Sequence, residues 1–463
     1  MRAAAFAFVG SALLPAAVVA KTPAEMEPLT WMSIPDTKMR AVQADPEQYA
    51  ELQGNGFPNV MLAWGGGVLD TTRLRMIIWG GGHNDYYGNE MYAFDIEALA
   101  WERLTEPTVD WNNCGDPNAD GTANARHTYR SLAYVEHADR MFVSGGALNC
   151  FSGSCGADVT WAFDFESLAW NDRQPSGSHS SNCENSAEYD PATGSVYFSD
   201  TGGLYRYHYD DNEWTQLNAD YLWAAATAID TTRGVLLMIA EGEVWSYDIA
   251  GANFERTDWN TTGGDDFIAG TAQGLAYDPT TDRYVGWGGD TIYALDPETQ
   301  AWETFDVPGA PEDLDGLRVW GRWRYVPGVN AFILITDVDT DVHFFKLSEG
   351  GMIPEPGGTG SSDGGDAGSA GDTAGDDGPD GEGGDAVDGP GTGAGVTGGD
   401  AGADGPSGQG TSAGGSSGAP AADGGGQDGG GCSCRATPSD ARPWLALLVL
   451  AAVRRRRRLG APT

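Results

Sequence analysis

A short pattern of aromatic and acidic residues returns five times between Tyr92 and Trp302. Each copy has two large apolar residues separated by one residue, an aspartate shortly after, and a further large aromatic residue. That residue follows the aspartate by six positions in four of the five copies. Such alternation places both apolar side chains on one face of a β-strand, and its repetition predicts equivalent β units. The copies are Tyr92-Ala93-Phe94-Asp95 with Trp101, Trp161-Ala162-Phe163-Asp164 with Trp170, Tyr205-Arg206-Tyr207 with Asp210 and Trp214, Trp245-Ser246-Tyr247-Asp248 with Phe254, and Tyr293-Ala294-Leu295-Asp296 with Trp302.

Each copy is preceded by a second apolar run, such as residues 76–80 and 284–288, which end in glycine. A further β-rich segment comes earlier still, for example residues 131–134 and 274–278. Their β-branched and aromatic residues are typical of strands. Each repeat therefore predicts four short antiparallel strands.

Four-stranded repeats with glycines after the second strand and tryptophan in the fourth resemble the blades of kelch-like β-propellers, a fold shared with the central domain of galactose oxidase. A sixth and final repeat, residues 323–345, has no fourth strand, whereas residues 31–34 form a strand without a repeat. We therefore predict an all-β fold, a six-bladed kelch-like propeller over residues 21–348 that is closed by its N-terminal strand. The repeat aromatics are then core residues, so function is expected in the loops.

The regions around the propeller predict export and display. Residues 1–20 carry Arg2, an apolar stretch and Val18-Val19-Ala20, which is typical of a signal peptide cleaved before Lys21. Residues 349–431 are rich in Gly, Asp, Ala and Ser, and they predict a disordered linker. With 67 acidic and 26 basic residues, the composition excludes nucleic acid as a partner.

Residues 432–463 combine Cys432 and Cys434, an apolar run at 444–453, and five arginines at 454–458. They resemble the MYXO-CTERM tails of myxobacterial surface proteins. The resemblance implies export, sorting-protease and anchoring machinery as partners, attachment near Cys432 or Cys434, and display on the cell surface or outer membrane. The apolar run is too short for a stable transmembrane helix, so membrane contact is expected through this tail only; a plain C-terminal membrane hook is the alternative.

The least repetitive segments, residues 80–90, 113–129, 149–155 and 178–185, fall in loops that lie on one face of a propeller. The Gly-Gly-Gly-His-Asn-Asp-Tyr loop and the segment 126–129 resemble parts of uncharacterised exported kelch-like proteins. We expect the binding surface for an extracellular glycan or protein here. Its candidate residues are His83, Asn84, Asp85, Tyr86, Arg126, His127 and Tyr129.

Cys114, Cys150, Cys155 and Cys183 lie in the same loops of an exported chain, so two disulfides are expected. Three pairings are possible. The favoured one joins Cys150 to Cys155 as a local clip and Cys114 to Cys183 between neighbouring connections.

Two metal sites are conceivable, one for a transition metal and one for calcium. His83, His127 and His179 share the loop face, and imidazole is a common transition-metal ligand, although hydrogen bonding alone would also account for them. Asp116, Asn118 and Asp120 match the first half of a calcium loop, but its twelfth position is His127 rather than Glu, and such residues are also ordinary turn formers.

The primary prediction is a surface binding or adhesion module. The alternative is a metal-dependent enzyme acting on extracellular carbohydrate, either copper oxidase-like or lyase-like. Galactose oxidase-like enzymes bind copper through His and Tyr, so His83, Tyr86, Tyr87, His127 and Tyr129 are the residues to compare, although no Tyr–Cys pair of their kind is evident. No Ser-His-Asp order, P-loop or dinucleotide motif is present. A structural surface spacer is the third possibility.

Overall fold

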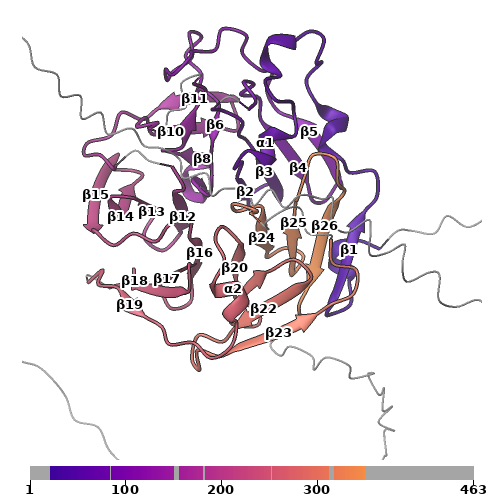
Figure 1. The fold of residues 1–463 in the computed structure, drawn as a ribbon, viewed down its shortest axis with the longest axis vertical. Coiled ribbons are helices and arrows are strands. Elements are labelled where there is room, and N and C mark those ends of the chain that lie inside the picture. The colour runs from indigo at the N-terminus through magenta and orange to yellow at the C-terminus, as the bar shows by residue number, and fades with distance from the viewer. Residues whose placement is uncertain are drawn as a thin grey trace, which may run out of the picture. The chain divides into compact units, whose positions relative to one another are not determined.

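Six antiparallel sheets of four strands each form a ring around a central axis (Figure 1). The computed structural model describes residues 21–83, 85–150, 156–180, 183–251, 253–311 and 318–350. The predicted signal peptide, nearly all of the predicted linker and the predicted sorting tail lie outside these residues. The prediction of an all-β, six-bladed propeller is confirmed.

Blades 1 to 5 follow the chain, and each runs from an inner first strand to an outer fourth strand. Their strands are β2 Gly67–Asp70, β3 Arg75–Ile78, β4 Tyr92–Asp95 and β5 Ala100–Arg103; β7 Leu132–Val135, β8 Arg140–Val143, β10 Trp161–Asp164 and β11 Ala169–Asp172; β12 Ser186–Asp190, β13 Ser195–Asp200, β14 Gly203–His208 and β15 Glu213–Asn218; β16 Ala226–Asp230, β17 Val235–Ala240, β18 Glu243–Asp248 and β19 Thr257–Asp258; β20 Gly274–Asp278, β21 Arg283–Trp287, β22 Thr291–Leu295 and β23 Trp302–Asp306.

Blade 6 closes the ring with strands from both ends of the propeller. Its order is β24 Trp323–Val326, β25 Ala331–Leu334, β26 Val342–Lys346 and then β1 Thr30–Ile34. Trp31 of β1 is opposite Phe345 of β26, and its ring also lies 6.0 Å from that of Trp323. The predicted closure by the N-terminal strand is therefore confirmed.

The repeated pattern occupies the third strand of each of the first five blades. Its apolar residues, such as Tyr92 and Phe94, are buried between sheets. Its aspartate closes the turn to the fourth strand, as where Asp95 Oδ1 accepts hydrogen bonds from the N–H groups of Glu97 and Ala98. The final aromatic residue of the pattern lies in the fourth strand of its blade, except in blade 4, where Phe254 precedes the short strand β19.

An ionic hub fills the centre of the ring. Glu188 of β12 accepts hydrogen bonds from Arg130, which precedes β7, and from Arg324 of β24. Arg130 also donates to the carbonyls of Thr227 in β16 and Leu275 in β20, and Arg324 donates to the carbonyl of Gly67 in β2. The hub therefore links five inner strands with the residues just before the sixth, β7.

Short helical turns and one small sheet lie in the connections. The helices are η1 Pro23–Glu25, η2 Met39–Val42, η3 Ala50–Leu52, α1 Asn59–Leu62, η4 Glu136–Ala138 and α2 Asp265–Ile268. Strand β6 Arg126–His127 pairs with β9 Ala147–Leu148 outside the blades. Within the described ranges, no helix has the length and apolar character needed to cross a bilayer.

Candidate functional site

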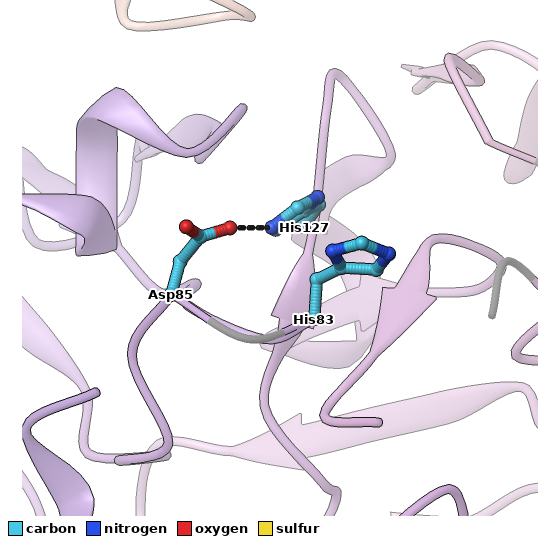
Figure 2. Close-up of side chains that lie close together, drawn as sticks. All are labelled: His83, Asp85 and His127. Carbon is cyan, nitrogen blue, oxygen red and sulfur yellow. Dashed lines mark hydrogen bonds and ion pairs between the residues drawn. The ribbon is translucent and has the colours of Figure 1, made fainter. Parts of the chain in front are cut away.

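His83, Asp85 and His127 converge where the long loop of blade 1 meets the connection to blade 2 (Figure 2). One possible ligand atom from each side chain lies within 4.8 Å of the other two. His127 Nε2 is 2.9 Å from Asp85 Oδ2, and the imidazole rings of His83 and His127 are 5.1 Å apart. We call these three residues the His–Asp cluster.

His127 is fixed by the small sheet. It lies in β6 opposite Ala147 of β9, and its side chain is only 2% exposed. The two strands approach so closely that a Cβ on Gly146, whose φ is +92°, would lie 2.5 Å from the carbonyl oxygen of His127. Glycine is therefore required at position 146 for His127 to take this place.

His83 is held through its backbone, whose φ of +55° is unusual for a residue with a side chain. Its N–H donates to the carbonyl of Leu148, and its carbonyl accepts from the N–H of Cys150, at 3.0 and 2.9 Å. No group among the described residues hydrogen-bonds to either ring nitrogen of His83. The segment after β9 thus positions the loop and leaves the His83 imidazole available.

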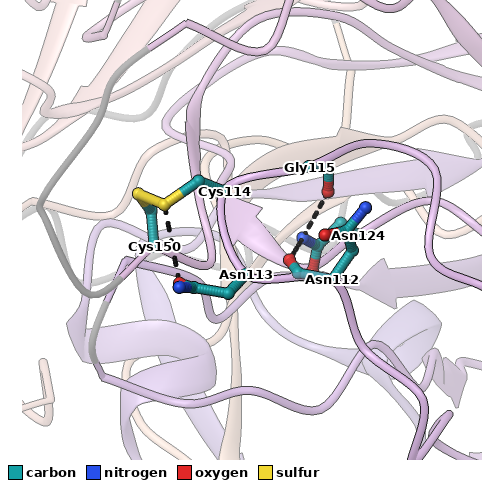
Figure 3. The surroundings of a disulfide bond; sticks show 6 residues. All are labelled: Asn112, Asn113, Cys114, Gly115, Asn124 and Cys150. Atoms are coloured by element: carbon teal, nitrogen blue, oxygen red, sulfur yellow. Dashed lines mark hydrogen bonds between the residues drawn. A yellow bond between two sulfur atoms is a disulfide. The ribbon is translucent and has the colours of Figure 1, made fainter.

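A disulfide between Cys114 and Cys150 ties this segment to the long connection between blades 1 and 2 (Figure 3). The favoured pairing of Cys150 with Cys155 and of Cys114 with Cys183 is therefore wrong. The physical reason is that the Cys114 N–H donates a hydrogen bond to the carbonyl of Asn149, which brings the segment around Cys114 beside the segment around Cys150. Cys183 is also disulfide-bonded, and its partner lies outside the described residues.

The connection that carries Cys114 is itself cross-linked by Asn124. The Asn124 side-chain amide donates to the carbonyls of Asn112 and Gly115, at 2.6 and 2.7 Å (Figure 3). The disulfide therefore links the segment that hydrogen-bonds to the His83 backbone with a connection that Asn124 cross-links.

The charges in the His–Asp cluster follow from burial and hydrogen bonding. Burial lowers the pKa of His127, although Asp85 acts in the opposite direction. Burial works to raise the pKa of Asp85, but hydrogen bonds from His127 and Asn55 outweigh it, so this pKa lies below its usual value. At neutral pH the pair is thus a neutral imidazole beside an ionised carboxylate.

An aromatic series extends from the His–Asp cluster to Trp320, which precedes β24 of blade 6. The Trp64 ring lies 4.9 Å from the His127 ring, His127 lies 6.1 Å from Tyr129, and Tyr129 lies 5.1 Å from Trp320. We call Trp64, His127, Tyr129 and Trp320 the axial aromatic cluster. Tyr129 and Trp320 are buried, whereas Trp64 is 37% exposed and its neighbour Leu62 is 53% exposed. Trp64 is thus the aromatic ring of this cluster that solvent reaches.

Three of the predicted binding residues have structural roles. Tyr86 is buried and donates its hydroxyl proton to Glu90. Arg126 is fully buried against Asp116 and over the Trp79 ring, and Tyr129 packs beneath the surface. Asn84 lies outside the described residues. Of the predicted set, the structure brings together His83, Asp85 and His127.

His179 is not part of the His–Asp cluster. Its side chain is buried in the connection between β11 and β12, where its Nδ1 lies 3.0 Å from Asp200 and its Nε2 lies 2.7 Å from Ser144. Both ring nitrogens are therefore engaged by protein groups.

The side chains of the predicted calcium loop also bind protein groups. Asp116 accepts hydrogen bonds from Arg126 and Trp161, and Asn118 accepts one from the N–H of Asn112. Asp120 accepts from both the N–H and the hydroxyl of Thr122. These contacts favour the explanation that the three residues shape turns.

The tyrosines compared with copper oxidases lie in other contacts. The Tyr86 hydroxyl donates a hydrogen bond to Glu90, and the ring of Tyr87 stacks on that of Trp111, with 4.7 Å between the ring centroids. Tyr129 packs edge-on against Trp320. Their observed partners are therefore core and loop residues.

Sequence reasoning missed Trp64 and Asn55. Trp64 stands directly before Gly65-Gly66-Gly67, a signal of close backbone packing that was available in the sequence. Its carbonyl accepts from the N–H of Tyr129, which sets it beside His127. The Asn55 side-chain amide donates a hydrogen bond to Asp85 Oδ1 from a turn 30 residues earlier in the sequence, and no local sequence pattern predicts that contact.

Comparisons with known proteins identify no family for this chain. No protein-family model matches the sequence, and no curated protein is significantly similar to it.

Proposed function

We propose that this protein is a surface-displayed binding module for extracellular carbohydrate, and that the ligand stacks on Trp64. The observation that carries the proposal is the exposed Trp64 ring beside the polar His–Asp cluster. Sugar rings present flat C–H faces rimmed by hydroxyl groups. A site of this kind needs one aromatic surface and a few fixed polar groups.

The two halves of such a site are adjacent here. Trp64 and Leu62 present apolar surface, and ligand sites combine apolar or aromatic surface with a few precisely placed polar groups. Asp85, whose side chain is 20% exposed, offers carboxylate oxygens to hydroxyl donors. A protein ligand would use the same patch, and carbohydrate is favoured because the exposed apolar area is small.

Display on the cell surface is part of the same proposal. Its support is the sequence of residues 1–20 and 349–463, with the resemblance of Cys432–Thr463 to bacterial sorting tails. The kelch-like resemblance of the repeats supports a loop-borne site. A propeller lifted from the surface on a long linker would present these loops to the surroundings.

A substitution at Trp64 tests the proposal. The full chain and its Trp64→Ala variant are screened against immobilised polysaccharides, and affinities for the ligands retained are measured by calorimetry. We expect binding about tenfold weaker in the variant, since stacking on one aromatic ring contributes on the order of 0.5–1.5 kcal/mol beyond the apolar area that it buries.

Leu168→Ala is the matched control, because Leu168 is 44% exposed in the turn between β10 and β11, away from the cluster. Undiminished polysaccharide binding by the Trp64→Ala variant would contradict the proposal. Retention of a protein instead of any polysaccharide would replace carbohydrate by a protein partner, and the absence of any ligand would leave the structural spacer.

A second candidate is a metal-dependent enzyme acting on carbohydrate, and the closeness of His83, Asp85 and His127 favours it. Catalytic turnover of a carbohydrate would distinguish this candidate from a binding module. New reducing ends, unsaturated products or peroxide formed by the metal-loaded protein, and not by a His83→Asn variant, would support this candidate over simple binding.

A further inference from the structure

We propose that His83, Asp85 and His127 form a binding site for one divalent first-row transition-metal ion. The inference goes beyond carbohydrate binding, because it concerns the ion alone and can be tested without any sugar. It also differs from the sequence-based set, since Asp85 takes the place of His179.

The ligand types define the class of ion. Two imidazoles and one carboxylate suit Fe²⁺, Mn²⁺, Co²⁺ or Zn²⁺, whereas Ca²⁺ and Mg²⁺ prefer oxygen ligands throughout. Three protein ligands also leave coordination positions open to water or to a bound molecule. The donor set therefore indicates an accessible site in preference to a closed structural one.

The separation of two donors already fits metal coordination. Metal–nitrogen and metal–oxygen bonds of about 2.0–2.1 Å hold two ligands at right angles roughly 2.9 Å apart. His127 Nε2 and Asp85 Oδ2 are 2.9 Å apart. Binding through Nε2 moves the ring proton to Nδ1, a change of tautomer that leaves the imidazole neutral.

The third donor completes the site by a small side-chain movement. All three donor atoms lie within 4.8 Å of one another, and Figure 2 shows the His83 ring beside that of His127. The His83 ring is only half-buried and has no hydrogen bond to a described residue, so it turns about its side-chain bonds without breaking one. Rotation of the His83 side chain therefore brings its ring nitrogen close enough to the other two donor atoms for all three to bind one ion.

Supporting contacts hold the other two ligands in place. Asn55 donates to Asp85 Oδ1 at 3.0 Å and leaves Oδ2 toward His127. The pairing of β6 with β9 fixes His127, and the Cys114–Cys150 disulfide fixes the segment that binds the His83 backbone. Such outer contacts orient metal ligands and raise affinity.

Two other histidines of the described residues, His137 and His343, lack such a grouping of donors. His137 pairs with Asp210 and also contacts Tyr189, on an exposed turn, and it lacks a second imidazole. His343 contacts Ser33. Among the described residues, the His–Asp cluster is the one group of His, Cys, Asp or Glu side chains in which three possible metal-ligand atoms lie within 4.8 Å of one another.

Titration with metal ions tests the inference. The full chain is freed of metal by dialysis against a chelator and titrated with Zn²⁺ by calorimetry and with Co²⁺ by visible absorption. We expect one saturable site that is lost, or weakened at least tenfold, in His83→Asn and in Asp85→Asn. Asparagine suits position 83 because it tolerates a positive φ.

His137→Ala is the matched control, since it removes a partly exposed histidine that also lies beside an aspartate. Circular dichroism confirms that each variant is folded, and Cys432 and Cys434 are present in all of them, so any binding at the tail is common background. Three results would overturn the site: no saturable binding by the wild type, equal affinity in the His83→Asn variant, or equal weakening in His137→Ala. Carbohydrate binding that persists without the ion would leave the proposed function standing.

Discussion

At the scale of single residues, Glu188 has a central structural role that no sequence pattern predicts. Its carboxylate lies between Arg130 and Arg324 and accepts a further hydrogen bond from Thr227. Burial works to raise the pKa of Glu188, but the two guanidinium groups lower it below its usual value. An ionised carboxylate in this position compensates the buried positive charge of Arg130 and the partly buried charge of Arg324.

The variant Glu188→Gln is therefore expected to lose about 3–5 kcal/mol of unfolding free energy, because it leaves the buried guanidinium of Arg130 and the partly buried one of Arg324 without a counter-charge. Urea unfolding followed by tryptophan fluorescence measures the loss. Glu102→Gln is the control, since Glu102 pairs with Arg75 at a side chain 53% exposed, and its loss should stay below about 1 kcal/mol. Equal losses in both variants would show that the hub is not special.

At the scale of elements, neighbouring blades are joined by a repeated ionic link between their first turns. Arg73, after β2, donates two hydrogen bonds of 2.6 Å to Asp139 of blade 2. Arg233, after β16, does the same to Asp282 of blade 5. In both links a tyrosine of the receiving blade donates to the same aspartate, which aligns the two sheets.

The second link predicts a pH effect. The hydrogen bonds from Arg233 lower the pKa of Asp282 to about 2, below its unfolded value of about 3.9. The link therefore stabilises the fold fully above about pH 4 and loses its effect as the pH falls toward 2. The pair is partly exposed, so its contribution is about 1 kcal/mol or less.

Comparison of the wild type with Asp282→Asn isolates this effect from the other carboxylates. The difference in unfolding free energy between the two proteins should be largest near pH 5 and shrink toward pH 2. Urea unfolding at intervals of half a pH unit provides the measurement. A difference that stays constant over this range would rule out the link as its source.

At the scale of the whole molecule, stability depends on closing the ring. Strand β1 covers the outer edge of β26 over five residue pairs, and Trp31 adds its ring to the core of blade 6. An uncovered strand edge offers free N–H and C=O groups to another chain. The first strand of the propeller thus protects its last blade.

Removal of residues 21–36 is expected to lower the urea midpoint and to promote self-association, since it exposes the edge of β26. Size-exclusion chromatography with light scattering detects the association, and a synthetic peptide of residues 28–36 should restore the monomer by adding the missing strand. Removal of residues 21–27, which keeps β1, is the control. A shortened protein that stays monomeric with an unchanged midpoint would contradict this account of closure.

The sequence by itself determined the blades and their closure. The alternation in segments such as Tyr92–Asp95 is a local property, because successive side chains of a strand point to opposite faces. The unmatched strand at residues 31–34 was likewise visible, since a repeat with a missing member has to be completed. For these features, the information lies within a few neighbouring residues.

Only the tertiary structure decided the pairing of Cys114 with Cys150, the burial of Tyr86 and Arg126, and the meeting of His83, Asp85 and His127. Each depends on how a loop of one blade approaches a connection from another. In loops, side-chain direction follows backbone angles such as the positive φ of His83 and contacts with distant residues such as Asn55. No periodic pattern encodes those contacts, so the residue types of the site were predictable, whereas their grouping was not.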